Sequence, residues 1–441
     1  MKEKSVRVGL VGFGTVGCGV ARLLVEQGEV LRAKTGIRFE LVCVVDLDTE
    51  TPRPVQLPDG VLTSDLNVLL DDERIEVAIE LVGGTGIAKE IQLKMLRAGK
   101  HVVTANKALL AVHGSELTQV AREADRCIAF EASCAGGIPI VSALRTGLMA
   151  NDITALYGIM NGTCNYILSK MSAEGTDFVE TLKEAQAKGY AEADPTLDIN
   201  GSDSSHKLTI LGSLAFGYEL QLEDVYTEGI EDVTKDDIRY ADEMGYCLKL
   251  LAIGQKKANG RVSLRVHPSF ILKETALARV NGPFNAISLF GHAVGEVLFY
   301  GRGAGMMPTA SAVVADVIEV ALGNSKRIFD QVQITSREQS VGQIEAMADC
   351  ESRFYVRIMA KDRPGVVAAY GKVLGDHGIS ISGALQHEGR GLDGTVPVVI
   401  VTHETQEKNM SAALAEITQL DTIGGKPVCI RIVDIPEDKD D

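Results

Sequence analysis

Cysteine pairs, long apolar runs and an excess of basic charge are all missing from this sequence. The eight cysteines are scattered, with no CxxC pair and no cluster with histidine, so neither a zinc site nor a disulfide framework is indicated. No apolar run approaches the roughly 18–20 residues that cross a bilayer, and the first residues are charged, so we expect no membrane span and no signal peptide. These absences predict a reduced, cytoplasmic chain.

The balance of charge limits the partners of the chain. It has 44 basic and 60 acidic residues, and the formal net charge of −16 would repel a phosphate backbone, so we expect no nucleic-acid partner. A composition of 45% hydrophobic and 24% charged residues is typical of a soluble globular protein and excludes disorder for most of the length. At roughly 100–200 residues per domain, the 441 residues form two to three domains.

Strand-like and helix-like segments alternate over the first 130 residues. This order predicts a mostly parallel, doubly wound sheet. The expected strands are residues 6–11, 39–45, 77–82, 101–104 and 127–130, and the expected helices include residues 87–98 and 116–124.

Beyond residue 135 the pattern predicts a second α/β unit with longer loops and then a small separate unit. The second unit includes expected helices at residues 140–149, 178–188, 204–216 and 236–245. Residues 308–321 form an unbroken helical pattern with proline at its entry, and residues 324–350 have the polar composition of a linker. From residue 353 the order is strand, helix, strand, strand, helix, strand, a βαββαβ unit.

A glycine motif follows the first expected strand and opens a helix. This is the context in which GxGxxG indicates dinucleotide binding. Gly12 permits a tight turn, Gly14 lets the backbone approach a pyrophosphate, and Gly17 lets helix and strand pack closely. The expected cofactor-binding residues of this motif are Gly12, Phe13, Gly14, Thr15, Val16 and Gly17.

Asp46 ends the second expected strand, where an acidic residue accepts hydrogen bonds from the adenosine ribose and disfavours a 2′-phosphate. It lies 29 residues after Gly17, longer than the usual spacing of about 20, which predicts an extended first helix. Arg53 is the only cation nearby. We therefore expect NAD or NADP as cofactor and favour NAD.

Two further stretches carry chemistry. Lys107 follows the strand at residues 101–104, on the rim where open parallel sheets bind ligands. The stretch from residue 189 to 207 holds four carboxylates within twelve residues. Glu192, Asp194 and Asp198 lie in an expected loop, and Asp203 lies on a helix that begins near Ser202. Asp203 and Lys207 are four residues apart on that helix and share one face, either as an exposed ion pair or as a proton-handling pair.

With these residues and spacings, the chain resembles the homoserine dehydrogenases of the long bacterial type, which carry a C-terminal ACT regulatory domain. Six motifs occur in the expected order over residues 1 to about 320, and DRPG within the βαββαβ unit resembles the ACT module. The motifs are GFGTVG (12–17), VVTANKALLA (102–111), EASCAGGIPI (131–140), NGTCNYIL (161–168), GYAEADPTLDINGSDSSHK (189–207) and YGRGAGMMPTASAVVADV (300–317).

The resemblance implies interconversion of L-homoserine and L-aspartate 4-semialdehyde with NAD(P), within threonine, methionine and isoleucine biosynthesis. It implies Lys207 as proton donor and acceptor, assisted by Asp203 and Lys107. The substrate-binding residues that it implies are Glu192, Asp198, Asn161, Thr163 and Tyr190, and the further cofactor-binding residues are Gly83, Gly84, Thr104, Lys107, Gly303, Ala304 and Gly305.

The resemblance also implies a monovalent cation, an effector and an assembly. Sodium would lie beside Glu131 and backbone carbonyls of Cys134, Gly136 and Ile138. L-Threonine is the expected effector at the ACT unit, near Asp362 and Gly365, and a homodimer or homotetramer is expected. The domain limits would be residues 1–134 with about 302–325 for a Rossmann-type dinucleotide-binding domain and 135–301 for an α/β catalytic and dimerisation domain. Residues 326–350 would be a linker, and 351–435 a ferredoxin-like ACT regulatory domain.

Two other functions compete with this interpretation. A semialdehyde dehydrogenase would need a thiolate nucleophile, for which Cys134 and Cys164 are placed in glycine-flanked loops, but no paired histidine lies near them. A non-enzymatic amino-acid sensor would use the ACT unit alone, with a vestigial dinucleotide fold. The presence of Lys107, Glu192, Asp203 and Lys207 favours the enzyme.

Overall fold

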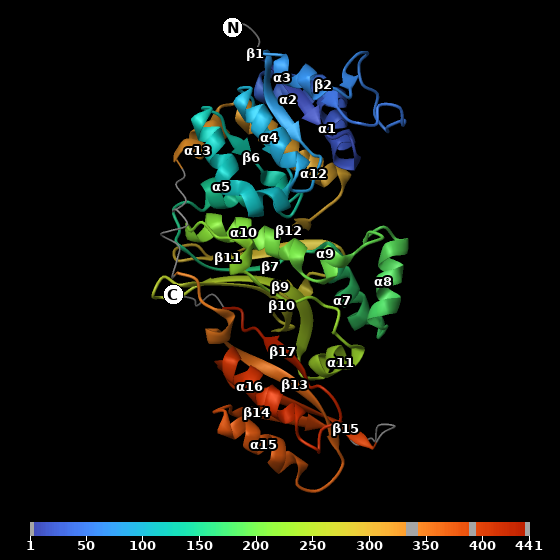
Figure 1. Ribbon diagram of the computed structural model, residues 1–441, viewed down its shortest axis with the longest axis vertical. Helices are drawn as coiled ribbons and strands as arrows, with labels where there is room; N and C mark the ends of the chain where they lie inside the picture. Colours follow the sequence, from blue (N-terminus) through green and yellow to red (C-terminus); the bar gives the residue numbers. More distant parts are fainter. Residues whose placement is uncertain (1–3, 332–342, 388–393, 437–441) are drawn as a thin grey trace. The chain divides into compact units, whose positions relative to one another are not determined.

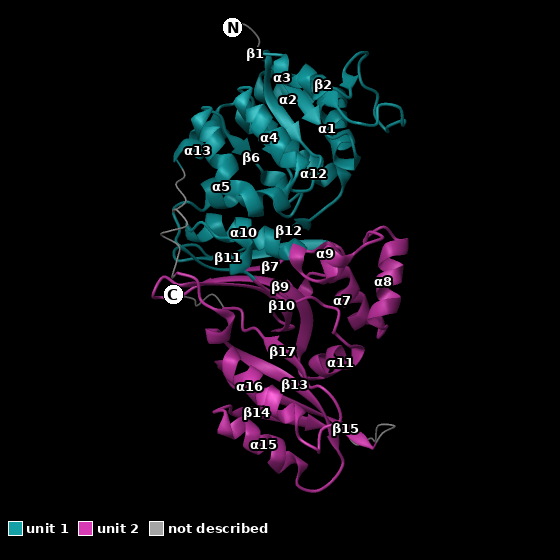
Figure 2. Ribbon diagram, in the orientation of Figure 1, with its two compact units in different colours: residues 1–156, 203–225, 284–341 teal, residues 157–202, 226–283, 342–441 magenta. Residues whose placement is uncertain are grey.

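The computed structural model describes residues 4–331, 343–387 and 394–436. The chain divides into two compact units (Figure 2), and each unit is assembled from three separate segments of sequence. The first unit contains residues 1–156, 203–225 and 284–341, and the second contains residues 157–202, 226–283 and 342–441. The predicted domain limits describe functional domains rather than these compact units, and they stay a prediction.

The first unit is built on a six-stranded sheet of parallel strands in the order β3-β2-β1-β4-β5-β6. The strand order reverses between β1 and β4, which makes this point the switch point at which doubly wound sheets bind ligands. The predicted Rossmann-type fold is therefore confirmed. The strands are β1 (Lys4–Val11), β2 (Ile37–Val45), β3 (Leu62–Thr63), β4 (Ile75–Glu80), β5 (His101–Thr104) and β6 (Ile128–Ala129).

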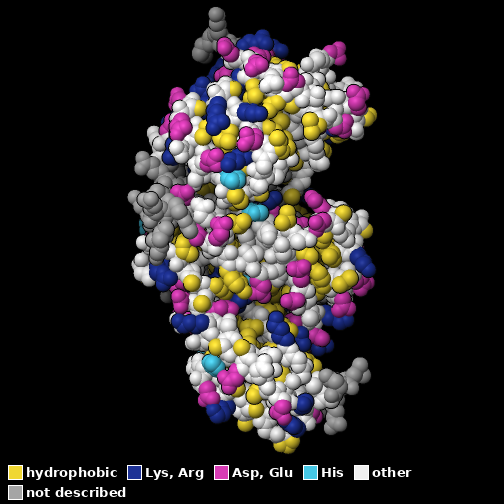
Figure 3. All heavy atoms as spheres, in the orientation of Figure 1, with side chains coloured by type: hydrophobic (Ala, Val, Ile, Leu, Met, Phe, Trp, Pro, Cys, Tyr) yellow, Lys and Arg dark blue, Asp and Glu magenta, His cyan; other side chains and the backbone are white. Residues whose placement is uncertain are grey.

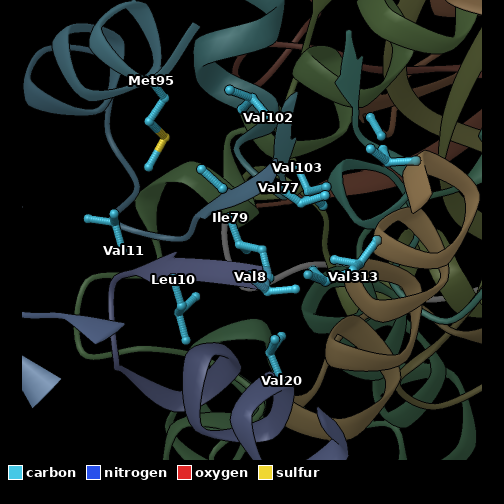
Figure 4. Packing of buried hydrophobic residues seen from close by; sticks show 14 of the residues in the cluster. Val8, Leu10, Val11, Val20, Val77, Ile79, Met95, Val102, Val103 and Val313 are labelled. Atoms are coloured by element: carbon cyan, nitrogen blue, oxygen red, sulfur yellow. The ribbon is translucent and has the colours of Figure 1, made fainter. Parts of the chain in front are cut away.

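The core of this unit lies between the central strands and their helices. Val8, Ile79 and Val103 are fully buried, and Figure 4 shows them packed together from β1, β4 and β5. Burying each such side chain stabilises the fold by about 1.5–3 kcal/mol, which explains why nearly continuous apolar runs form these strands. Val313 joins the same core from a helix some 300 residues later in the chain.

The helices of the sheet differ in two places from the prediction. The first helix is of ordinary length, and a second helix after Gln27, rather than an extension, accounts for the long spacing to Asp46. The helix after β5 begins at Lys107, nine residues before the predicted start, because Asn106 caps it. The helices are α1 (Thr15–Glu26), α2 (Gly28–Thr35), α3 (Leu66–Asp71), α4 (Ile87–Arg97) and α5 (Lys107–Glu123).

The later segments of the first unit bring three further helices and a hairpin to it. The helix predicted at residues 140–149 is only α6 (Ile140–Ser142), followed by a π-helical turn at Ala143–Gly147. Residues 324–331 form a helix with Phe329 buried, although they were predicted as part of a linker; residues 332–342 of that linker lie outside the described residues. The other elements are α10 (Ser202–Phe216), β11 (Phe284–Gly291), β12 (Gly295–Arg302), α12 (Met306–Ala321) and α13 (Asn324–Gln331), with 3-10 turns at Glu131–Ser133 and Leu222–Asp224.

The second unit combines a helical layer with a long antiparallel strand pair, β9 and β10. The segment predicted as a loop from Glu192 to Asp198 contains a short helix, α9. The strand β7 (Ile153–Ile159) leads from the first unit into the second. The other elements are α7 (Gly162–Glu174), α8 (Phe178–Ala187), α9 (Thr196–Ile199), β8 (Tyr226–Thr227), α11 (Lys235–Glu243), β9 (Tyr246–Lys256) and β10 (Val262–Leu272), with 3-10 turns at Leu277–Arg279 and Met347–Asp349.

The C-terminal part of the second unit is the predicted βαββαβ arrangement (Figure 1). Its strands form an antiparallel sheet in the order β17-β13-β15-β14, and β17 also pairs in parallel with β10. Phe354, Tyr370 and Ile400 belong to its separate core. The elements are β13 (Glu351–Lys361), α15 (Val366–Asp376), β14 (Ile381–Gln386), β15 (Thr395–Thr402), β16 (Thr405–Gln406), α16 (Glu407–Thr418) and β17 (Val428–Ile432).

Within the described residues, no single helix is long and apolar enough to span a membrane; α12 and α13 reach that length only together, across a bend of 83°. Acidic and basic side chains are interspersed over the described residues on the face that Figure 3 draws.

Candidate active site

The glycine motif forms the turn between β1 and α1, as predicted. Gly12 has a φ of +96°, and a Cβ there would lie 2.7 Å from the backbone of Leu81. A Cβ on Gly17 would lie 2.1 Å from the carbonyl oxygen of Gly12, whereas Gly14 faces open space. The N-terminus of α1 has no side-chain cap and no acidic residue in its first turn. These features fit a pyrophosphate, because an uncapped helix N-terminus attracts an anion.

Asp46 lies directly after β2 and is bonded to the glycine turn. Its Oδ2 accepts a hydrogen bond from the backbone N–H of Phe13 at 2.6 Å. Arg53 donates through Nε to the carbonyl oxygen of Phe13 at 3.0 Å and pairs with Asp48 at 3.3 Å. The structure thus brings the predicted acid and the neighbouring cation to the same turn.

Gly83, Gly84 and Thr104 lie at the carboxyl edge of the same sheet. Both glycines are exposed and left-handed, with φ values of 81° and 71°, in the turn after β4. Thr104 is buried and ends β5. The sequence did not single out Asn106, which caps α5 with its side chain and thereby orients the turn that carries Lys107. Its signal would have been an asparagine directly before a helix.

Lys107, Asp203 and Lys207 meet in one cluster, as the sequence predicted for the last two. Asp203 Oδ1 lies 3.0 Å from Lys107 Nζ, and Oδ2 lies 2.6 Å from Lys207 Nζ. The side chains of Asp203 and Lys207 are only 10% exposed, and that of Lys107 is 36% exposed. One carboxylate therefore holds two ammonium groups, and the exposed lysine faces solvent at the rim of the sheet.

The EASCAGG turn (residues 131–137) contacts this cluster through Cys134. Ala135 and Gly136 follow each other in left-handed conformations, with φ values of 52° and 46°. Cys134 Sγ lies 4.0 Å from the carbonyl oxygen of Lys207, and burial raises the pKa of the Cys134 thiol to about 12. A thiol with this pKa is not a thiolate at neutral pH, which argues against the semialdehyde dehydrogenase alternative.

Glu131 is buried at the start of this turn. Its carboxylate accepts hydrogen bonds from the backbone N–H groups of Val141, at 2.9 Å, and Ser142, at 2.7 Å. Burial raises the pKa of Glu131, and it also raises that of Asp316, which accepts from the Glu131 backbone at 2.8 Å. Asp316 was not predicted, although a single aspartate within the apolar helix α12 is a signal that could have found it.

The donors near Glu131 suit a hard monovalent cation. Carbonyl oxygens of Cys134, Gly136 and Ile138 come from the same tight turn, and Glu131 adds a carboxylate. Among the residues the structure describes there is no group of three or more His, Cys, Asp or Glu side chains suited to a metal ion, so a site here would depend on backbone oxygens.

Gly303, Ala304 and Gly305 pack against the EASCAGG turn. A Cβ on Gly136 would lie 2.6 Å from the carbonyl oxygen of Gly303, and Gly305 has a φ of +126° where it precedes α12. This turn therefore closes on residues of the first unit that are more than 160 positions earlier in the chain.

Four of the five predicted substrate residues gather in the second unit. Asn161 caps α7 through Oδ1 and donates through Nδ2 to Asp198 at 2.7 Å. Thr163 donates to the carbonyl oxygen of Tyr190 at 2.6 Å. Glu192 is exposed, and within the described residues its side chain forms no hydrogen bond or ion pair with the other four. Cys164 is buried there as well and donates to the Asp198 carbonyl at 3.2 Å.

An open parallel sheet with an uncapped helix N-terminus at its switch point is the fold of dinucleotide-binding proteins. A buried lysine held by a carboxylate at the same edge adds a group that can move a proton. Fold and site thus define a nicotinamide-dependent oxidoreductase.

The comparisons with known proteins specify this class further. Residues 139–318 match the family described as homoserine dehydrogenase, residues 12–131 match its NAD binding domain, and residues 354–422 match the ACT domain. The homoserine dehydrogenase of Pseudomonas aeruginosa is 44% identical, over 97% of this chain and 99% of its own, and that of Synechocystis is 42% identical, over 97% and 100%. The chain belongs to the homoserine dehydrogenase family and is an NAD(P)-dependent oxidoreductase of amino-acid biosynthesis.

Solved structures agree with this assignment. The homoserine dehydrogenase from Thiobacillus denitrificans is 41% identical, with a TM-score of 0.88 over 98% of this chain and 99% of its own. A hyperthermophilic archaeal homoserine dehydrogenase mutant in complex with NADPH is 27% identical, with a TM-score of 0.61 over 72% of this chain and 98% of its own. The ACT domain of this chain is consistent with regulation by a small-molecule effector.

Proposed function

We propose that Lys207 is the acid–base group with which this chain interconverts L-homoserine and L-aspartate 4-semialdehyde. The observation that carries the proposal is the contact of 2.6 Å between Lys207 Nζ and Asp203 Oδ2 in a buried setting. When bound, the nicotinamide accepts or supplies the hydride. In the reductive direction the Lys207 ammonium donates a proton to the substrate oxygen as the carbonyl becomes an alcohol; in the oxidative direction the amine takes it back.

Asp203 and Lys107 assist this transfer. Asp203 orients Lys207, and because it shares its charge with Lys107 the cluster carries a net positive charge. A positive charge fixed in place stabilises negative charge that develops on the substrate oxygen. Both residues therefore have a role in the reaction without exchanging a proton with the substrate.

The amino-acid end of homoserine needs a carboxylate partner for its ammonium group. We assign this role to Asp198 and Glu192, with Asn161, Thr163 and Tyr190 shaping the pocket around them. Asp198 accepts one hydrogen bond from Asn161 at 2.7 Å, and a carboxylate has acceptor sites for about three further donors.

For the cofactor we propose NAD or NADP, with NAD favoured. The residues that would hold it are those of the glycine turn with Asp46, and at the other end Gly83, Gly84, Thr104, Lys107 and the turn Gly303, Ala304 and Gly305. A monovalent cation, sodium in the first place, is proposed at Glu131 with the carbonyls of Cys134, Gly136 and Ile138.

We further propose regulation by L-threonine at the ACT domain, a homodimer or homotetramer as assembly, and a cytoplasmic location. Asp362 lies in the exposed turn between β13 and α15. Gly365 directly precedes α15 with a φ of +91°, and a Cβ there would meet no heavy atom within 4 Å. A left-handed glycine at a helix N-terminus leaves the N–H groups accessible to a carboxylate.

The purified chain should reduce aspartate semialdehyde with a nicotinamide cofactor, followed by the loss of reduced-nicotinamide absorbance. Lys207→Ala should lower kcat by about 10²–10⁴, the usual range for a positioned acid–base group. Lys188→Ala is the matched control, because Lys188 is 53% exposed and pairs with Glu184 in the second unit. An unchanged kcat in Lys207→Ala would remove the proposed role.

A further inference from the structure

A glutamate with no cationic partner among the described residues is buried at the carboxyl edge of the first unit's sheet. Glu80 is the last residue of β4 and is 0% exposed. In the sheet it is paired with Val11 of β1 on one side and Thr104 of β5 on the other. The residues before these, Ile79 and Val103, point into the apolar core in Figure 4. A carboxylate in this position is costly unless its acceptor sites are used.

Within the part of the chain that the structure describes, Glu80 accepts four hydrogen bonds, all from neutral donors. Oε1 accepts from the backbone N–H of Val82 at 2.7 Å and of Gly83 at 3.2 Å. Oε2 accepts from Gln92 Nε2 at 2.7 Å and from Thr104 Oγ1 at 2.9 Å. Four donors and no acceptor match the pattern of a carboxylate. Glu80 is therefore bonded to three separate segments: the turn after β4, helix α4 and the end of β5.

The same hydrogen bonds continue into the turn that carries Lys107. Thr104 Oγ1 accepts from the backbone N–H of Asn106 at 3.0 Å. Asn106 Nδ2 donates to the carbonyl oxygen of Gly84 at 2.8 Å, and its Oδ1 accepts from the Leu109 N–H at 3.1 Å. The chain of contacts closes on itself, because Gly84 follows Gly83, which donates to Glu80. Glu80 thus fixes two turns of the sheet edge against each other.

These two turns both carry residues of the proposed cofactor site. They lie next to the switch point between β1 and β4, where a doubly wound sheet binds its ligand. Gly83, Gly84 and Thr104 are proposed cofactor residues, and Lys107 directly follows Asn106 and reaches Asp203 at 3.0 Å. We propose that Glu80 is a positioning residue that holds both turns in the arrangement that receives the nicotinamide end of the cofactor and orients Lys107. This inference rests on the proposed cofactor site.

The neighbours of Glu80 allow a conservative replacement. In Glu80→Gln the amide oxygen can accept from Val82 and Gly83, while its NH2 group faces Gln92 and Thr104. Gln92 Oε1 is buried and has no hydrogen-bond partner among the described residues, so its amide group can turn to accept from that NH2 group. Glu80→Ala, in contrast, removes all four bonds and leaves the donors unsatisfied. Glutamine should therefore retain most of the function that alanine loses.

The test compares two ligands that differ at the nicotinamide end. NADH and ADP-ribose share the pyrophosphate that the glycine turn would bind, but ADP-ribose has no nicotinamide. We expect Glu80→Ala to bind NADH roughly tenfold more weakly and ADP-ribose within about twofold of the unmodified chain. Its kcat should fall by about 10²-fold, as for a reacting group displaced by about 1 Å. Glu80→Gln should stay within about threefold of the unmodified chain in NADH affinity.

Two further variants keep the test decisive. Glu80→Asp keeps the carboxylate but shortens the side chain by one methylene, so it cannot bond both turns and should also weaken NADH selectively, even if Glu80→Ala does not fold. Glu76→Gln is the matched control, because Glu76 is an exposed glutamate on the same strand. Equal weakening of NADH and ADP-ribose, or equal damage from glutamine and alanine, would overturn the proposal. Absence of homoserine turnover in the unmodified chain would count against the proposed function instead, since the two binding constants do not depend on it.

Discussion

At the scale of single residues, the contacts of Arg53 bear on whether the chain prefers NAD or NADP. The guanidinium donates to the carbonyl oxygens of Phe13 and Thr51 and pairs with Asp48. Hydrogen bonds from Thr51 hold the pKa of Asp48 below its usual range, so Asp48 stays ionised at neutral pH. The cation near Asp46 is thus already occupied by acceptors of its own turn.

We therefore expect kcat/KM for NAD(H) to be at least as high as for NADP(H), because a 2′-phosphate would meet Asp46 and Asp48 before an accessible cation. Asp48→Asn should raise kcat/KM for NADP(H) by up to about fivefold, since it removes one of the two negative charges that a 2′-phosphate would meet. Steady-state rates with both cofactors measure this. A clear NADP(H) preference in the unmodified chain would show that Arg53 outweighs the two carboxylates.

Single residues were predictable where a local motif marks them. The glycine turn and the pairing of Asp203 with Lys207 follow from local spacing, and Asp46 follows from its place at the end of the second strand. Asn106 and Asp316 also had local signals, but Glu80 had none, because its role depends on partners that the sheet brings close: Glu80 meets Thr104 on the neighbouring strand, 24 positions away.

At the scale of elements, β5 begins with a histidine that folding keeps neutral. His101 Nδ1 accepts a hydrogen bond from the backbone N–H of Cys127, next to β6, at 3.1 Å. Burial, followed by the charges of Arg126 and Lys326, lowers the pKa of His101 to about 4. The unfolded chain, with an ordinary histidine pKa of about 6.5, takes up this proton more readily. Stability from this group is therefore present above about pH 6.5 and is lost as the pH falls towards 4.

His101→Asn should reduce the acid sensitivity of the fold, because asparagine can accept at the position of Nδ1 but does not titrate. Between pH 6.5 and 4 the unmodified chain should lose stability more steeply than the variant, by at most about 1.4 kcal/mol per pH unit. Thermal unfolding at several pH values measures both slopes, and the acidic residues common to both chains cancel. Parallel slopes would contradict a neutral buried His101.

Helix α11 and strand β13 are joined by a buried ion pair within the second unit. Arg357 Nε lies 2.6 Å from Asp237 Oδ1, and Nη2 lies 3.0 Å from Oδ2. Asp237 is fully buried and also accepts from Tyr355 at 2.9 Å.

Arg357→Met should lower the free energy of unfolding by about 3–5 kcal/mol, because it leaves the Asp237 charge buried without its partner. Arg363→Met is the control: Arg363 pairs with Asp421 at 2.8 Å, but both are exposed, so the free energy of unfolding should fall much less than in Arg357→Met. Urea unfolding of the two variants compares them. Equal losses would mean that burial of the first pair has no energetic consequence.

Elements were predictable in number and order more than in extent. The periodicity identified the alternation of the sheet and the βαββαβ unit. It missed α2, because Gln27 interrupts one helical pattern without a proline or a strong turn signal, and it placed the start of α5 nine residues late, because only the Asn106 cap marks it.

At the scale of the whole molecule, the ACT sheet is continuous with the rest of the second unit. β17 pairs with β10, and Arg431 of β17 contacts Glu228 at 2.7 Å and Glu407 at 2.6 Å. Cutting the chain near residue 331 would therefore unpair Asp237 and Glu228 as well as remove the effector site. A regulatory test needs the full chain.

L-Threonine should inhibit the full chain 5- to 150-fold at saturation, the range of a coupling free energy of about 1–3 kcal/mol. Asp362→Ala should raise the threonine concentration for half-maximal inhibition at least about tenfold. Asp376→Ala is the matched control, since Asp376 is an exposed acid at the opposite end of α15. Unaltered sensitivity in Asp362→Ala, or no inhibition of any chain, would defeat the regulatory proposal.

The overall division of the chain was only partly predictable. The resemblance implies that residues 302–325 return to the dinucleotide-binding part, and this stays a prediction; in the structure α12 packs on α1. Residues 203–225 also belong to this compact unit, whereas residues 157–202 belong to the other. No local sequence signal near Ser202 marks this change, so it could not be predicted.

The late arrival of α12 has a consequence for how the chain is made. A Cβ on Gly19 of α1 would lie 2.9 Å from Ala310, and Val313 and Val317 are fully buried, so α12 completes the core of the first sheet. The ribosome adds this helix 192 residues after β6 ends, from Ala129 to Ala321, which at roughly 5–20 residues per second takes about 10–40 s. Throughout that interval the part of α1 that later packs against α12 is uncovered, so aggregation and packing against another helix can compete with correct folding of the first unit.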